Sequence, residues 1–228
     1  MMKKYLMFFL PLALLPATGA GQRFFDDFDG EDLGGHWEFG NPKGGMIYSV
    51  HDSLLEVHSL EGYSSHEWIT ARLPEFDDFD MRAVVGWTDA PREQLLMVLL
   101  DAGPFPNPPS VAWMAYARGV SGGEEYNIVQ AGFEDGPGRN AGSPPGGFHE
   151  FRITRTGGVF AAYLDGDLFL EGPGTDIRPR WLTLFFDGPN GENVDLFVDS
   201  VSVVPEPLSA LVLAMGMGAL ALRRRRTR

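Results

Sequence analysis

Cysteine is absent from the 228 residues, so no disulfide bond supports the fold and a hydrophobic core has to hold it together. Sustained helical periodicity is also missing, because no stretch between residues 22 and 204 carries an apolar stripe over several turns. Basic residues are scarce in the same region, which holds 11 of the 18 Lys and Arg but 30 of the 31 Asp and Glu, a formal charge of −19. A domain this acidic repels nucleic acid and anionic lipid, so we expect neither as a partner.

Two long hydrophobic runs lie at the two ends of the chain. At the start, Lys3 and Lys4 precede an apolar run over residues 5–15, and small residues follow as far as Ala20. This order is typical of a cleaved signal peptide, so residues 1–20 are predicted to direct export. A retained membrane helix is the alternative, but the run is short for a bilayer.

At the other end, Pro205, Glu206 and Pro207 precede an uncharged apolar stretch, 208–222, and then four arginines, Arg223, Arg224, Arg225 and Arg226. As a helix this stretch is about 22 Å long, marginal against a hydrocarbon core of about 30 Å. The arginines keep the tail end cytoplasmic, which places the preceding domain outside the inner membrane. The tail, 205–228, resembles the PEP-CTERM sorting signal of Gram-negative bacteria. That resemblance implies cleavage by an exosortase-type membrane protease and delivery to the cell surface or extracellular matrix, with a plain C-terminal anchor as the alternative.

Between these ends, short runs rich in Val, Ile, Phe, Tyr and Trp alternate with Gly, Pro, Asn and Asp, which predicts an all-β domain over residues 21–204. Hairpin turns are predicted at Gly157-Gly158 and at Asp165-Gly166. Strands are expected at 53–58, 79–89, 94–100, 111–116, 126–131, 148–155, 159–164, 181–186 and 194–203, with loops around 103–109 and 133–147. About a dozen strands without helices indicate two packed sheets or a barrel.

Several of these segments, in order, are similar to one known domain class. Residues 24–37 and 52–57 look like its opening, residues 147–166 like its hairpin, and residues 196–203 like a final strand that pairs back with the first. The class is that of concanavalin-A-like lectin/glucanase domains of the laminin-G-like kind. The resemblance implies a two-sheet antiparallel jelly-roll sandwich, here placed between an N-terminal signal helix and a C-terminal hydrophobic helix.

Glycosidases of this fold use paired carboxylates, and its laminarinase-type members present Glu-x-Asp-x-x-Glu. The nearest match here is the segment from Glu75 to Asp80, where Asp replaces the last Glu; an acidic turn before a strand is the simpler interpretation. Glu124 and Glu125 are adjacent and point to opposite faces of a strand. The pair Glu134-Asp135 lies in a glycine-rich loop. We therefore name no catalytic residue and expect a non-enzyme rather than an enzyme.

Metal ligands are not clearly arranged in the sequence. Oxygen ligands cluster between Asp26 and Asp32, but their spacing is not that of an EF-hand loop, and an Asx-type turn is favoured. No cofactor is predicted, and a structural calcium elsewhere stays open. The five histidines show no zinc-type spacing, although His51, His58 and His66 could converge across adjacent strands.

Aromatic rings that stack on sugars are the remaining candidates for a site. The binding candidates are Trp68, Trp113, Tyr116 and Tyr126. In a regular strand Trp113 and Tyr116 face opposite sides, so one of the two is expected outside. We predict a surface or matrix interaction module that binds glycan, with the cell's own exopolysaccharide as the expected ligand. The alternatives are a glycoside-processing enzyme on the same fold and a structural surface protein that binds protein partners.

Overall fold

The computed structural model describes residues 23–40, 46–59, 65–89, 93–106, 109–121, 124–188 and 196–205. All regular secondary structure in these residues is β-strand. Among the described residues we find no helix that could cross a membrane. The predicted signal peptide, residues 1–20, lies outside the described residues, as does the sorting tail apart from Pro205.

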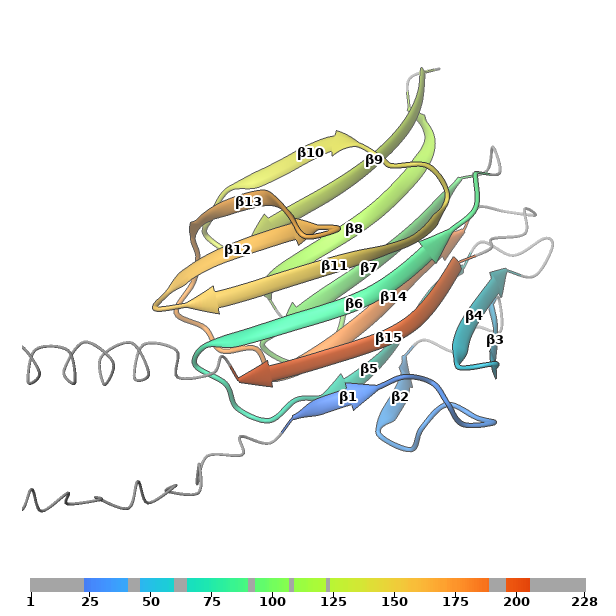
Figure 1. The fold of residues 1–228 in the computed structure, drawn as a ribbon, viewed down its shortest axis with the longest axis horizontal. Helices are drawn as coiled ribbons and strands as arrows, with labels where there is room; N and C mark the ends of the chain where they lie inside the picture. Colours follow the sequence, from blue (N-terminus) through green and yellow to red (C-terminus); the bar gives the residue numbers. More distant parts are fainter. Residues whose placement is uncertain are drawn as a thin grey trace, which may run out of the picture.

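The strands form two antiparallel sheets, which lie one over the other in Figure 1. Sheet A has the order β13 (Asp167–Pro173), β12 (Val159–Leu164), β11 (Gly147–Thr156), β6 (Phe79–Trp87), β15 (Leu196–Pro205), β4 (Leu54–Ser59) and β3 (Met46–His51), and β1 (Phe24–Asp26) also pairs with β15. Sheet B has the order β10 (Gly138–Gly142), β9 (Glu124–Phe133), β8 (Ser110–Ser121), β7 (Gln94–Asp101), β14 (Trp181–Gly188), β5 (Ser65–Arg72) and β2 (Trp37–Gly40). The predicted all-β sandwich of two antiparallel sheets is confirmed.

One hydrophobic core fills the space between the sheets. Trp87 of sheet A stacks on Tyr116 of sheet B, with ring centroids 4.1 Å apart and planes 6° from parallel. From β7, Leu96, Val98 and Leu100 point into the same core and have no exposed surface. Since successive side chains of a strand alternate between faces, the residues between these three point away from the core.

The last strand shows how alternation is kept in a strand that contains a bulge. Leu196 and Val198 are buried, and so are Val201 and Val203, which have the opposite parity. The register against β6 shifts between Val198 and Ser200, and this extra residue returns the apolar side chains to the core. The end of β15 pairs with β1, Phe24 opposite Val203, so the predicted pairing of the last strand with the first is confirmed.

Both predicted hairpin turns are confirmed by positive φ values at Gly157, Gly158, Asp165 and Gly166. The predicted loop over 133–147 is wrong in part, because β10 lies within it and pairs with β9. Small and polar residues fill β10, so its pairing depends on backbone hydrogen bonds and leaves no hydrophobic pattern.

Candidate functional site

The outer face of sheet B is the face of the sandwich on which the candidate aromatic residues gather. Registers across β5, β14, β7 and β8 align Thr70, Thr183, Leu99 and Trp113 in one row. Although this row points away from the core, Thr183 has no exposed surface and Leu99 only 4%. Something other than the core therefore covers part of this face.

The cover is the loop that joins β7 to β8. Phe105 of this loop lies over β5 and β14, with its ring centroid 4.9 Å from that of Trp68 and 5.6 Å from that of Phe185. Trp68 keeps only 9% of its surface exposed as a result. The half of sheet B that carries β8, β9 and β10 lies beyond these contacts.

Two aromatic rings on that half lie across glycines of the neighbouring strand. Trp113 is opposite Gly132, and a Cβ placed on that glycine would stand 2.8 Å from the indole Cζ2. Tyr126 is opposite Gly119, whose Cβ would meet the phenol oxygen at 2.5 Å. A flat ring resting on a glycine backbone presents its other face outward, which is the geometry of a stacking platform.

Between the two rings the face carries two alanines of β8, and Ile128 and Gln130 of β9. Ala115 and Ala117 share the outward parity of Trp113 but are buried, with 1% and 9% of their surface exposed, and Ile128 lies opposite Ala117. Gln130 and Asn140 are paired across β9 and β10 on the same face; Gln130 is half-buried and Asn140 exposed. Each amide offers both donors and an acceptor, the groups that bind hydroxyls.

Asp101 is the carboxyl group buried most completely on this face. Its oxygens accept hydrogen bonds of 2.7 Å from the hydroxyls of Ser110 and Thr183, and Thr183 also lies 3.3 Å from the hydroxyl of Thr70. Burial raises the pKa of Asp101 to about 6, and the two hydroxyl donors only partly oppose this. Asp101 therefore takes up a proton close to neutral pH.

Asp187 is a second carboxyl on the same face. Burial raises its pKa, against the lowering effect of His66, whose Nδ1 lies 3.0 Å away. Asp101 lies opposite Trp181, six residues before Asp187 on β14, so the two carboxyls are about 20 Å apart. Carboxylates that act as a pair on a glycosidic bond stand about 5 to 9.5 Å apart. Asp101 and Asp187 do not form such a pair.

The aromatic residues named from the sequence separate into three groups. Trp113 and Tyr126 lie on the outer face of sheet B with accessible rings, and Trp68 lies there beneath Phe105. Tyr116 lies in the core with no exposed surface, because its separation from Trp113 is odd. Its ring is therefore not available to a ligand, and we remove it from the set.

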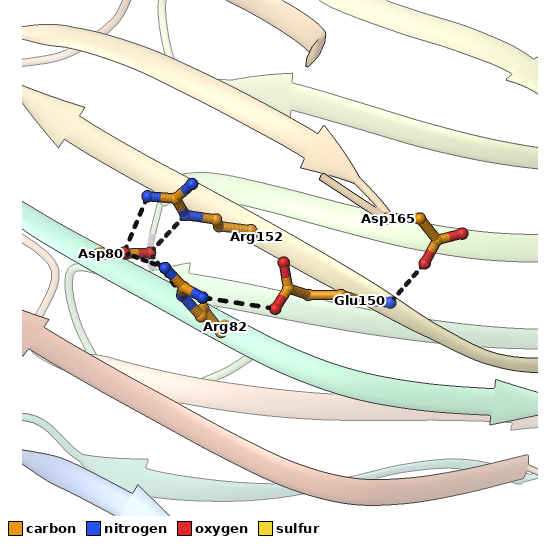
Figure 2. A network of polar contacts seen from close by, with 5 residues as sticks. All are labelled: Asp80, Arg82, Glu150, Arg152 and Asp165. Carbon is orange, nitrogen blue, oxygen red and sulfur yellow. Dashed lines mark hydrogen bonds and ion pairs between the residues drawn. The ribbon is translucent and has the colours of Figure 1, made fainter. Parts of the chain in front are cut away.

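The acidic segment from Glu75 to Asp80 is the nearest match to a catalytic motif, and its carboxylates take part in separate ion pairs. Glu75 pairs with Arg180, and Asp77 pairs with Arg178. Figure 2 shows Asp80 on the other sheet, where it lies between the guanidinium groups of Arg82 and Arg152. Glu75, Asp77 and Asp80 are thus each engaged by arginine side chains, and they do not gather in one place.

Metal binding was left open by the sequence. Asp26 accepts a hydrogen bond from the backbone N–H of Phe28, which is the favoured Asx-type turn. His51 and His58 do converge, on the carboxylate of Glu56, but His66 lies on the opposite sheet. Within the described ranges no group of three or more His, Asp or Glu side chains is arranged to hold a metal ion. A structural calcium stays a prediction.

No protein-family model and no curated protein matches the sequence. Solved structures do match the fold. The CBM2 module of the evolved Dit of Lactobacillus casei BL23 phage J-1 has a TM-score of 0.62 at 12% identity, over 79% of this chain and 93% of that one. A protein from work on endo-acting O-glycanases of human gut microbiota members that initiate mucin breakdown has a TM-score of 0.61 at 14% identity, over 79% and 98%. The laminarinase from Rhodothermus marinus has a TM-score of 0.59 at 12% identity, over 80% and 96%.

These likenesses show a jelly-roll fold, which the chain shares with this CBM2 module and with laminarinases. They also correct one expectation. The sequence was interpreted as that of a non-enzyme rather than an enzyme, whereas the similar structures include the laminarinase and an endo-β-1,3(4)-glucanase, both enzymes. The preference for a non-enzyme is therefore withdrawn.

Sequence reasoning missed several residues of this face: Trp181, Gln130, Asn140, Asp101 and the glycines under the rings. One signal was available. Gly119 and Gly132 interrupt two strands that are otherwise rich in large residues, and an isolated glycine in a strand marks the close approach of another group.

Proposed function

We propose that this protein is an exported glycan-processing protein that holds a polysaccharide chain along the outer face of sheet B. The observation that carries the proposal is the pair of rings, Trp113 over Gly132 and Tyr126 over Gly119, with the amides of Gln130 and Asn140 on the same face. Rings stack on sugar faces while amides bind hydroxyls, so this combination suits a carbohydrate more than a protein partner. The similar structures, which include a carbohydrate-binding module and a laminarinase, support the same class of ligand.

The direction of the bound chain follows from the positions of three aromatic residues. Trp181, Trp113 and Tyr126 succeed one another along the face; we call them the aromatic line. Trp181 and Trp113 are about 12 Å apart by strand spacing and rise, and Trp113 and Tyr126 about 21 Å. The line crosses β14, β7, β8 and β9 diagonally. Its length suits a chain of several sugars rather than a single monosaccharide.

Binding is tested with laminarin, mixed-linkage β-glucan, xylan and mucin O-glycans by affinity electrophoresis and calorimetry. Trp113→Ala removes one platform, and we expect a loss of affinity of about tenfold or more, comparable to the loss of a buried aromatic contact. Phe148→Ala is the matched control, because Phe148 is 52% exposed on the outer face of sheet A. Equal losses in the two variants would overturn the placement of the site.

Cleavage is tested on the same panel by release of reducing ends and by mass analysis of products. Asp101→Asn and Asp187→Asn are each compared with the native chain, because these carboxyls are too far apart to act as a pair and must be judged singly. Products from the native chain support processing, and a variant that binds but releases none locates the chemistry. Binding without products from any chain would remove cleavage from the proposal and leave the polysaccharide site.

Export and sorting are part of the same proposal. The order of Lys3, Lys4, an apolar run and small residues supports export, and Pro205-Glu206-Pro207 before an apolar stretch and four arginines supports sorting by an exosortase-type protease. The final location would be the cell surface or extracellular matrix, where polysaccharide is the abundant polymer. A structural calcium is part of this proposal only as a question for the binding assays, in which Ca²⁺ is tested as an additive.

A further inference from the structure

Arg72 lies at one end of the outer face of sheet B and has no partner in the described part of the chain. It is exposed, and its register position opposite Trp181 gives it the outward parity of that residue. Other arginines near this end are engaged: Arg178 with Asp77 at 2.6 Å and Arg180 with Glu75 at 3.1 Å. No such contact between described residues involves Arg72, so within that part of the chain its guanidinium has five donors available.

The surroundings of Arg72 suit a ligand group rather than empty solvent. It lines a shallow cavity together with Leu73, Pro74 and Glu75. The charge of Glu75 is balanced by its ion pair with Arg180, so it does not cancel the attraction of Arg72 for an anion. Trp181, directly across the strand pair, has its Cβ within about 5.5 Å of that of Arg72. A stacking ring and a cation therefore stand side by side at the start of the aromatic line.

The rest of the face has the opposite charge. Glu38 on β2 and Glu124 on β9 are exposed with the same outward parity, and Asp187 lies between them on β14. Glu124 lies two residues from Tyr126 on β9 and so stands beside the aromatic line, whereas Glu38 on β2 and Asp187, which pairs with His66, lie to one side of it. A polymer that carries a negative charge on every sugar would therefore meet Glu124. Repulsion between exposed charges is felt within about 8 Å at physiological salt, so Glu124 is the carboxylate that acts on a chain bound along the line.

We propose that the ligand is a sparsely acidic polysaccharide, with a neutral backbone on the aromatic line and an isolated carboxylate, sulfate or phosphate substituent that pairs with Arg72 beside Trp181. This inference rests on the proposed function and specifies its substrate class. A planar guanidinium binds such oxyanions with two parallel hydrogen bonds. Glu124 and the overall acidity of the domain disfavour densely charged polymers, and Arg72 selects the acidic substituent.

The test uses one backbone at three charge densities: laminarin, sparsely carboxymethylated laminarin and densely carboxymethylated laminarin, with the same series made from xylan. We expect the sparse form to bind about threefold more tightly than the neutral form, as an exposed ion pair allows, and the dense form to bind more weakly than either. In Arg72→Gln the preference for the sparse form falls to none while neutral binding is kept. Arg178→Gln is the control, since Arg178 is also exposed but already paired with Asp77 and lies outside β14.

The outcomes separate this inference from the proposal on which it rests. If neutral and sparse forms bind equally, or if Arg72→Gln keeps the preference, the acidic substituent is overturned and the polysaccharide site stands. If the dense form binds best, the exclusion of densely charged polymers by Glu124 and the acidic domain is overturned. If none of the forms binds to a natively folded chain, the polysaccharide site fails and this inference fails with it. Thermal unfolding of each variant confirms that its fold is kept.

Discussion

Asp101 shows how much a single carboxyl can make stability depend on pH. Its pKa is about 6 in the folded protein against an ordinary 3.8, so the folded chain binds the proton more tightly than the unfolded chain. The stabilisation of the folded state that comes from proton binding to Asp101 is complete below about pH 4, and it is lost as the pH rises through 6. The difference corresponds to about 3 kcal/mol of unfolding free energy between pH 4 and pH 8.

Asp101→Asn should abolish this dependence, because an amide is neutral throughout and can still bond both hydroxyls. Relative to the native chain, we expect the variant to gain about 3 kcal/mol between pH 4 and pH 8 in urea unfolding. Asp29→Asn, at an exposed position after β1, is the control for the same chemical change at the surface. A curve for Asp101→Asn that runs parallel to that of the native chain would contradict the burial argument.

The substitution Gly132→Ala tests the placement of the Trp113 ring by adding one carbon atom beneath it. A Cβ there would stand 2.8 Å from the Trp113 ring, so in Gly132→Ala the ring must swing away. We expect polysaccharide affinity to fall several-fold with a stability loss of about 1 kcal/mol or less, since a side-chain end can move at low cost. The Trp113 indole resonance in NMR spectra should shift.

Gly138→Ala is the matched control for this change. Gly138 is the cross-strand partner of Gly132 on the same face, but its Cβ would meet only a carbonyl oxygen at 3.6 Å. Neither affinity nor the Trp113 resonance should change. If both alanines weaken binding alike, the effect comes from the backbone of β9 and β10 and not from the ring.

At the scale of elements, β6 and β11 are joined on the outer face of sheet A by one carboxylate and two guanidinium groups. Arg152 on β11 donates to Asp80 on β6 at 2.8 and 2.9 Å, while Arg82 donates from the same strand at 3.0 and 3.4 Å (Figure 2). Burial raises the pKa of Asp80, but the hydrogen bonds and charges of Arg152 and Arg82 outweigh it and hold that pKa below its ordinary value. The network therefore stabilises the pairing of the two strands above the ordinary pKa of Asp and loses this effect as pH falls.

Arg152 and Arg82 should contribute unequally to the free energy of unfolding. Arg152→Met should cost about 1 to 3 kcal/mol near neutral pH, because it removes two charge-assisted bonds from a buried carboxylate. Arg82→Met should cost less than about 1 kcal/mol, because Arg82 is 48% exposed. Denaturant unfolding gives both values, and the deficit of Arg152→Met should shrink below about pH 4. The reverse order of the two costs would be incompatible with this geometry.

The elements that could be predicted are those whose side chains alternate. In β11, Phe151 and Ile153 are buried and Arg152 is not, so the pattern is visible in the sequence. β5 was missed because both of its faces are buried: Ile69 faces the core and Trp68 lies under Phe105. β3 was missed because its turn uses Asp52 and Ser53 at positive φ in place of glycine.

The site was less predictable than the fold, for a geometric reason. Trp113 and Tyr126 could be named as aromatic residues in strands, but the register that sets each against a glycine is a property of paired strands. Gln130 lies on β9 and Asn140 on β10, and no pattern in the sequence predicts β10 as a strand. The pKa of Asp101 depends on its burial and on the hydroxyls of Thr183 and Ser110, which come from two other strands, and composition carries no information about those contacts.

At the scale of the whole molecule, charge is divided between the domain and the tail. Residues 22–204 carry −19, whereas Arg223 to Arg226 place four positive charges at the other end of the chain. If the tail is removed after export, the released domain is far more acidic than the precursor. That change favours solubility and keeps the domain away from anionic surfaces.

Removal of the tail is the last prediction, and the structure indicates how to test it. Pro205 is the final residue of β15 and pairs with Phe79, so changing it would also disturb the sheet. Glu206→Ala with Pro207→Ala leaves β15 intact. In a Gram-negative host with an exosortase-type protease, we expect this variant to stay in the inner membrane with its tail, while the native chain reaches the surface without it. Fractionation and intact-mass analysis distinguish the two, with the exposed Glu124→Ala as a control. Equal release of the variant would show that the tail is only an anchor.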